Sequence, residues 1–239
     1  LADALREYAA VTKDSPHHAD AQLRIAIIEM RNGDLRQAEQ RVRAVLRTRP
    51  ALMGAWEVLS GVLLEAKAYQ RLVDESKDIA SAAGASNVLL YNRAIALEFL
   101  HRYGEMEAAL RRILRRNPRH AEALNFLGYS LAERGERLDE AKELIQRALK
   151  IKPDSPYYLD SLAWVYYRQG RLTRALRLQR KALAGDVQDP VMYEHLGDIY
   201  RALGRNADAA AAYRKALGMK HEQAQRVRRK LRAVLGGQS

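Results

Sequence analysis

Several features are scarce in this chain of 239 residues, and each scarcity excludes a class of protein. The sequence has no Cys, which excludes disulfide frameworks and Cys-based metal or nucleophilic sites. No apolar run approaches the ~20 residues that a helix needs to cross a membrane. Only 6 residues are Pro, and aromatic side chains make up 7%. Ala, Leu, Arg and Glu dominate instead, which favours helix. An excess of 41 Lys and Arg over 29 Asp and Glu makes the chain basic.

The sequence repeats itself with a period of about 34 residues. The six units begin at Ala19, Met53, Asn87, Ala121, Pro156 and Pro190. The unit from Ala121 has one extra residue, which lies in its internal turn. Most units carry apolar residues at positions 4, 7 and 11 and Gly at position 15, and each has a small residue at position 8. This pattern predicts two helices joined by a tight turn, with close contact at position 8.

Some units depart from the pattern. Glu29 lies at position 11, where an apolar residue is expected, and Lys67 replaces the turn Gly. Leu72 stands at a normally small position of the second helix, and Arg93 lies at a core position. We expect helices there as well, with looser or shifted packing.

The pattern resembles the tetratricopeptide repeat, and the resemblance covers nearly the whole chain. It implies an all-α fold, a right-handed superhelical solenoid of helix-turn-helix repeats. Residues 1–18 would be the second helix of a truncated upstream repeat, which makes the chain a fragment of a longer array or one processed at its N-terminus. Residues 221–235 would form an overlapping C-terminal capping helix and 236–239 a disordered tail. The six complete repeats expected within 19–223 are 19–52, 53–86, 87–120, 121–155, 156–189 and 190–223.

In this family the first helices line a concave groove, which positions 2, 5, 9, 12 and 13 would present. The candidate partner-binding residues in that register are Tyr91, Asn125, Tyr129, Tyr157, Asp160, Trp164, Tyr167, Arg168, Glu194 and Asp198. Two interpretations of Trp164 and Tyr167 stay open. They form an exposed aromatic platform flanked by carboxylates, or they pack on the neighbouring first helix and belong partly to the core.

The sequence was also considered for catalytic, metal-binding and nucleic-acid-binding residues. Asp160, Glu194 and Asp198 are expected near one another, as a recognition patch rather than an acid–base pair. We therefore expect no enzyme, no metal site and no cofactor. Asn125 lacks the Lys and Asn array of the family's clamp for C-terminal carboxylates. Basic residues of the second and last helices, including Arg226 and Lys230, are expected mainly on the convex side. That side gives an alternative function, a regulatory module that binds nucleic acid or another acidic partner.

The segments 124–129, 158–167 and 189–204 also resemble a narrower group, the envelope tetratricopeptide proteins of proteobacteria. These include outer-membrane lipoproteins that act as adaptors for a carboxyl-terminal processing protease. The resemblance implies a protein-binding scaffold or adaptor in a bacterial envelope protease or assembly complex. It favours the periplasm or the outer membrane, with the cytoplasm as the alternative location.

Overall fold

The computed structural model describes residues 2–185, 187 and 189–236, and in these residues all regular secondary structure is helical. The fifteen helices fall into two compact units, Leu1–Arg116 and Asn117–Ser239, which we describe separately. The prediction of an all-α helix-turn-helix fold is confirmed. Of the expected tail, Gly236 is the last residue of a helix, and 237–239 lie outside the described residues.

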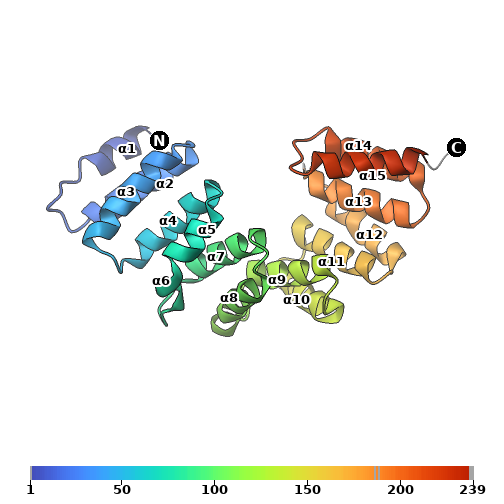
Figure 1. Ribbon diagram of the computed structural model, residues 1–239, viewed down its shortest axis with the longest axis horizontal. Helices are drawn as coiled ribbons and strands as arrows, with labels where there is room; N and C mark the ends of the chain where they lie inside the picture. Colours follow the sequence, from blue (N-terminus) through green and yellow to red (C-terminus); the bar gives the residue numbers. More distant parts are fainter. Residues whose placement is uncertain (1, 186, 188, 237–239) are drawn as a thin grey trace. The chain divides into compact units, whose positions relative to one another are not determined.

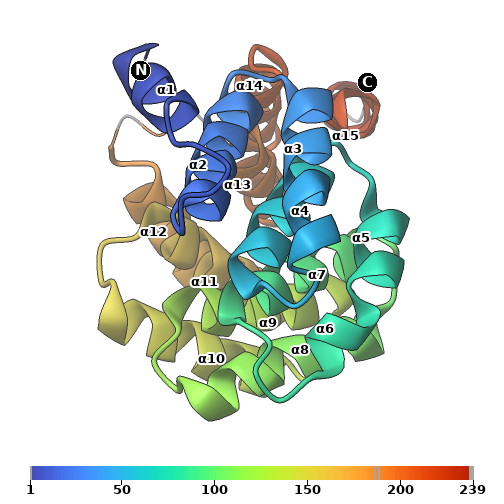
Figure 2. The same cartoon turned by 90° about the vertical axis from the view of Figure 1, so that its left-hand side faces the viewer.

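Unit 1 contains eight described helices, and most consecutive helices are in contact, as Figure 2 shows for α2 and α3. The first, α1, ends at Ala9, so it fills only the first half of the segment 1–18 that was expected to hold the truncated second helix. Two helices are found where each predicted repeat needs them, except that α5 and α6 share the place of one second helix. The bounds are α1 Ala2–Ala9, α2 His18–Arg31, α3 Leu35–Thr48, α4 Met53–Glu65, α5 Tyr69–Glu75, α6 Lys77–Ser81, α7 Asn87–Phe99 and α8 Tyr103–Arg116.

Unit 2 contains three helix pairs and one further helix (Figure 1). The first helices α9, α11 and α13 contact one another in order, and each packs against its own second helix. The bounds are α9 Ala121–Arg134, α10 Leu138–Ile151, α11 Pro156–Arg168, α12 Leu172–Ala182, α13 Pro190–Ala202, α14 Asn206–Leu217 and α15 Ala224–Gly236.

The turn inside each repeat requires a left-handed backbone at position 15. Gly135, Gly170 and Gly204 all have φ of 72° there, a conformation that costs Gly nothing. Where Gly is missing, the turn keeps its shape, because Lys67 and His101 adopt φ of 54° and 57°. The extra residue of the fourth repeat is absorbed in the same way, since Arg137 has φ of 42°. The turn geometry is therefore imposed by the packing of the two helices.

Close contact at position 8 is confirmed in unit 2. A Cβ atom added to Gly197 would lie 2.3 Å from the Tyr213 ring, and one added to Gly128 would lie 2.6 Å from Ile145. The paired helices thus approach to a distance that only Gly permits at these two points. Tyr213 is fully buried between α13 and α15, where it packs with Val227.

The irregular positions of unit 1 find polar partners. Glu29 is buried and accepts from Arg41 through both oxygens: Nε lies 3.1 and 3.0 Å from Oε1 and Oε2, and Nη2 donates to Oε1 at 2.6 Å. Arg93 is also buried and donates to the Val73 carbonyl and, at 2.9 Å, to Ser76 Oγ. Ser76 is where one second helix breaks into α5 and α6. The predicted shift in packing is therefore a helix break that accommodates a buried guanidinium.

Helix α15 begins later than predicted. It starts at Ala224 rather than His221, because His221 lies in a turn where its Nδ1 accepts the Gln223 N–H at 3.0 Å. The helix packs on α14 through the buried residues Val227 and Val234. It covers the last apolar surface of unit 2 while showing water a basic face, as a capping helix should.

Candidate functional site

The site is built on the first helices of unit 2. Positions 2, 5, 9, 12 and 13 of α9, α11 and α13 lie on one side of these helices, and we call this side the first-helix face. Helical periodicity brings positions 5 and 9 of each helix one above the other. Contacts between α9 and α11, and between α11 and α13, bring these positions of successive helices together. The face therefore collects side chains that are about one repeat apart in the sequence.

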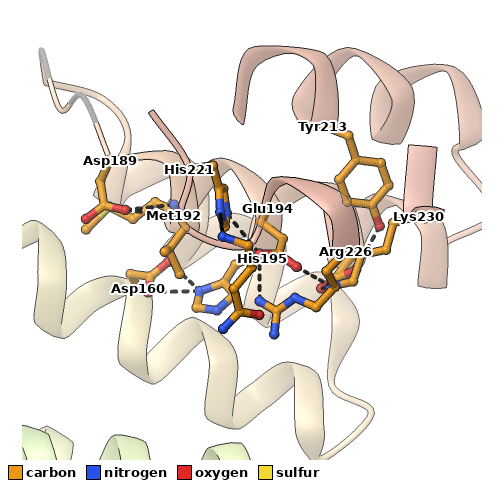
Figure 3. Close-up of polar contacts among 12 residues, drawn as sticks. Asp160, Asp189, Met192, Glu194, His195, Tyr213, His221, Arg226 and Lys230 are labelled. Carbon is orange, nitrogen blue, oxygen red and sulfur yellow. Dashed lines mark hydrogen bonds and ion pairs between the residues drawn. The ribbon is translucent and has the colours of Figure 1, made fainter. Parts of the chain in front are cut away.

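Asp160 on α11 is bound from two sides. Both of its oxygens lie close to Nδ1 of His195 on α13, at 3.1 and 3.0 Å. Gln179 on α12 donates to Asp160 Oδ1 at 2.6 Å and to the Met192 carbonyl at 2.8 Å. Burial disfavours a charged imidazole, but the Asp160 carboxylate outweighs it and raises the pKa of His195. The result is a buried Asp–His pair that joins two first helices (Figure 3).

Glu194 on α13 has no exposed surface and three basic neighbours. Arg226 Nη2 donates to it at 2.7 Å and Lys230 Nζ at 2.6 Å, both from α15. His221 Nε2 lies 3.1 Å from the same carboxylate, and Figure 3 shows these three groups around it. Burial alone would raise the pKa of Glu194, but the hydrogen bonds from Arg226 and Lys230 lower it to about 2. Glu194 is therefore a structural anion that anchors α15.

Asp198 lies one helical turn further along α13. The Tyr213 hydroxyl donates to its Oδ1 at 2.7 Å, and Lys230 Nζ donates to its other oxygen. Burial and the Asp198 charge raise the pKa of Tyr213 well above its usual range, so the phenol stays protonated and keeps donating. Lys230 thus connects Glu194 and Asp198 to α15.

Trp164 is at the centre of an aromatic stack. Its ring lies 4.2 Å from the His195 ring and 4.7 Å from the Tyr167 ring, with planes 19° and 20° apart. Tyr129 adds a tilted contact to His195 at 6.1 Å. Trp164 is only 7% exposed, so the interpretation as an exposed platform is wrong for this residue. The alternative, packing on the neighbouring first helix, describes it, because the His195 ring of α13 covers it.

The three candidate carboxylates require a similar correction. Asp160, Glu194 and Asp198 are buried and take their hydrogen bonds from the chain itself. They do not form an exposed acidic patch around the aromatic residues. The physical reason is that α15 and His195 supply the countercharges that a bound partner was expected to supply.

The remaining candidates lie nearer the surface. Tyr157 on α11 is 58% exposed, and Val191, at the same repeat position on α13, is 37% exposed. Asn125, Tyr129, Tyr167 and Arg168 are half-buried. Arg168 donates to the Glu133 carbonyl on α9. The tenth candidate, Tyr91, is half-buried on α7 and belongs to unit 1.

Two buried polar atoms of the first-helix face form no hydrogen bond. In the described part of the chain, the buried atoms Oδ1 of Asn125 and Nε1 of Trp164 have no hydrogen-bond partner. One is an acceptor and the other a donor. Leaving such atoms unpaired costs about 1–3 kcal/mol each.

The residues that the sequence did not reveal are the countercharges. His195, His221 and Gln179 were not candidates, and Arg226 and Lys230 were assigned to the convex side. That assignment is wrong for these two, whose side chains turn toward α13. A signal existed, since Glu194 and Asp198 have the same four-residue spacing as Arg226 and Lys230, 32 residues later in both cases. Two helices in register place such pairs opposite each other.

The described residues offer no other kind of site that was considered, neither a metal centre nor a membrane-spanning helix. No group of three His, Cys, Asp or Glu side chains there is placed to hold a metal ion. In the same residues, no helix combines the length and apolar character needed to cross a membrane.

Comparison with protein families gives the class of this chain. Two tetratricopeptide repeat models match it, one over residues 91–156 and 161–225 and the other over 1–52. The first alone covers more than half of the sequence. The chain therefore belongs to the tetratricopeptide repeat family, whose members bind other proteins or peptides and are generally not catalytic.

Curated relatives carry the same repeat. A TPR repeat-containing protein of Pseudomonas aeruginosa, PA4667, is 37% identical over 203 residues, which is 82% of this chain and 33% of the relative. A TPR repeat-containing protein of Methanocaldococcus jannaschii, MJ1428, is 30% identical over 114 residues, 48% of this chain and 20% of that protein. The chain thus spans a third or less of the length of these relatives.

Solved structures share the fold. A tetratricopeptide repeat protein from Parabacteroides merdae superposes with a TM-score of 0.68 at 18% identity, over 91% of this chain and 98% of its own. PilF of Pseudomonas aeruginosa gives 0.69 at 17% identity, over 89% and 97%. PilW, a type IV pilus biogenesis factor, gives 0.54 at 19%, over 94% and 89%. At these identities the similarity concerns the helical solenoid fold alone.

Proposed function

We propose that this chain is a non-catalytic scaffold or adaptor that binds a peptide segment or a partner protein on the first-helix face of unit 2. The observation that carries the proposal is the pair Tyr157 and Val191. Both lie at position 2 of neighbouring helices, and both leave large apolar surface in water. Exposed apolar side chains at corresponding positions of adjacent repeats are what a partner buries on binding.

The residues beneath this surface hold it rigid. Trp164 is fixed by stacking on His195 and Tyr167, and His195 is fixed by Asp160. A surface held in one conformation loses little entropy when a partner binds.

The test uses a photo-crosslinking amino acid at two exposed positions. We place it at Tyr157 on the proposed surface and, as a matched control, at Arg177 on the exposed side of α12. We expect a defined crosslinked partner from the Tyr157 site and none in common with the Arg177 site. An additional Tyr129→Ala substitution should reduce the crosslink, because Tyr129 lies on the same face.

The choice of variants follows from burial. Tyr157→Ala removes an exposed ring and should leave stability within about 0.5 kcal/mol. Trp164→Ala would empty a buried site and cost about 3–5 kcal/mol, so loss of binding in that variant would not distinguish binding from unfolding. If Tyr157→Ala and Tyr129→Ala, both folded, retain every partner that crosslinks at position 157, the proposal is wrong.

For the cellular role, we propose an adaptor in a bacterial envelope protease or assembly complex, in the periplasm or at the outer membrane, with the cytoplasm as the alternative. The resemblance to envelope adaptor proteins supports this proposal, as does the role of PilW as a type IV pilus biogenesis factor. Fractionation of the parent protein, followed by recovery of the Tyr157 crosslink from each fraction, tests it. A crosslink obtained from the cytosol alone would contradict the envelope role.

A second candidate function rests on the outer face of α15. Arg228, Arg229 and Arg232 are exposed there. They suit an acidic partner or nucleic acid, although no aromatic residue of α15 is available for base stacking. Oligonucleotide binding that weakens steeply between about 50 and 200 mM salt would support this function. Salt-independent or absent binding would leave the first-helix face as the functional surface.

A further inference from the structure

Arg93 is a buried guanidinium at a position where the other repeats are apolar. It occupies position 7 of α7 and is 9% exposed. The corresponding residues of the other five repeats are Ile25, Leu59, Leu127, Leu162 and Leu196. A charged residue at a core position of a repeat costs stability unless something compensates it, and such local exceptions mark functional positions.

The partners of Arg93 are neutral. Its Nη1 donates to the Val73 carbonyl and to Ser76 Oγ, and no carboxylate lies within ion-pair distance of it among the described residues. Arg112 on α8 is similar, since it donates to the carbonyls of Ala80 and Ala82. Burial lowers the pKa of both arginines, which reflects the cost of holding these charges away from water. Neither arginine has an ion-pair partner among the described residues, although the charges of Glu105 and Asp74 offset part of the effect of burial on the pKa of Arg93.

An open pocket of about 280 Å³, which we call the cavity below, lies beside them. Its wall has a basic part and an apolar part, and the lining residues that matter here are Lys77, Leu90, Arg93, Leu97, Glu105 and Arg112. Glu105 is the acidic residue of this lining, and Arg102 already binds it through two hydrogen bonds of 2.7 and 2.9 Å. Lys77 is exposed and forms no ion pair within the described ranges. The lining therefore combines basic side chains with apolar ones, and Arg93 lies between Leu90 and Leu97 on α7.

We propose that this cavity binds a monocarboxylate with a short apolar tail, whose carboxylate pairs with Arg93 and whose tail packs on Leu90 and Leu97. The planar guanidinium matches a carboxylate better than a point charge would. The apolar wall favours a ligand with a hydrocarbon portion over inorganic anions. The carboxylate could belong to a short fatty acid or to the C-terminus of a peptide. This site lies in unit 1 and does not depend on the function proposed for unit 2.

The experiment is calorimetric titration of the full chain with four probes. Sodium hexanoate and N-acetyl-Ala-Leu with a free carboxylate represent the two sources, and hexanamide and N-acetyl-Ala-Leu-amide are their neutral controls. We expect at least one carboxylate to bind and its amide to bind about tenfold more weakly or not at all. Preference between the two carboxylates identifies the source. If neither carboxylate binds better than its amide, the proposal is overturned.

Arg93→Leu separates the binding role from a structural one. Leu restores the apolar pattern of the repeat, so this variant should fold with an unchanged or higher melting temperature and lose carboxylate binding. The matched control is Arg115→Leu, which removes an exposed guanidinium from α8 outside the cavity lining and should bind within about threefold of the parent chain. If Arg93→Leu binds hexanoate and the peptide carboxylate as the parent does, Arg93 serves packing alone. Should it fail to fold, Arg93→Lys, which keeps the charge but loses the planar fork, replaces it, and unchanged binding there would contradict the proposed pairing.

Discussion

Lys230 on α15 places its ammonium nitrogen 2.6 Å from Oε1 of Glu194, a carboxylate with no exposed surface on α13. The pair joins residues 36 positions apart in the sequence. Together with the contact of Arg226 to the same carboxylate, this pair fixes α15, a helix that has few other polar links to the rest of unit 2. Breaking the pair should therefore affect both the stability of unit 2 and the attachment of α15.

Replacing one residue of the Glu194–Lys230 pair should destabilise the chain more than replacing both. Glu194→Gln leaves two cations beside a neutral amide and should lower the free energy of unfolding by about 3 kcal/mol. Lys230→Met in the same chain should recover part of that loss, which a double-mutant cycle measured by urea unfolding detects. Arg205→Met, at the exposed pair with Asp208, is the control and should cost less than about 1 kcal/mol. Strict additivity of Glu194→Gln and Lys230→Met would contradict a coupled pair.

Acid should weaken the same interaction. The pKa of Glu194 is lowered from 4.5 to about 2 in the folded chain. Its contribution to stability is therefore fully present above about pH 4.5 and is lost as the pH falls toward 2, by up to about 3 kcal/mol. The difference in unfolding free energy between the parent chain and Glu194→Gln should shrink over that range. A difference that is as large at pH 2.5 as at pH 6 would refute the assignment.

The contribution of His195 to stability should depend on pH in the opposite direction, with loss at high pH. Burial opposes its charge, but Asp160 raises its pKa above 6.5. The charged pair therefore contributes fully below pH 6.5 and is lost as the pH rises through the folded-state value. An NMR titration of the His195 ring should give a midpoint above 6.5, and Asp160→Asn should lower it. An unchanged midpoint in Asp160→Asn would show that Asp160 is not the cause.

Close packing at Gly197 predicts a contrast between two glycines. Gly197→Ala places a methyl group 2.3 Å from the Tyr213 ring and should destabilise the chain by about 1–3 kcal/mol. Gly54→Ala, also in a first helix, meets nothing closer than Leu23 at 3.8 Å and should stabilise the chain by about 0.4–1 kcal/mol. Thermal unfolding of both variants measures this. Equal effects would indicate that helix propensity, rather than contact with Tyr213, determines the result.

The fold could be predicted because its determinants recur. Gly197, Gly128 and the turn glycines repeat at one spacing, and each repeat confirms the register of the others. The break between α5 and α6 was less predictable, since it depends on one residue, Arg93, taking the Val73 carbonyl from the helix. Arg93 departs from the pattern in one repeat only, so no other repeat in the sequence indicates what such a residue does to the structure.

The sequence predicted where the candidate residues lie on the helices, but it did not predict which of them are buried. Register placed Asp160, Trp164, Glu194 and Asp198 on the first helices, where the structure has them. Whether such side chains face water depends on what covers them, and the covering groups come from His195 and from α15. These belong to other helices, so the repeat pattern carries no information about them. Tyr157 stays exposed because none of the described residues of unit 2 covers it.

The polar links among α11, α13 and α15 also bear on how the array unfolds. In a linear array, stability is shared between the intrinsic terms of each repeat and the coupling between neighbours. Asp160–His195 joins two consecutive first helices, and Glu194–Lys230 joins the last of them to the capping helix α15, so both pairs add to coupling and not to any one repeat. In unit 1, the interruption at Ser76 divides a second helix into two short pieces. Cooperative loss of structure is thus expected to start near Ser76 and to reach α13 last.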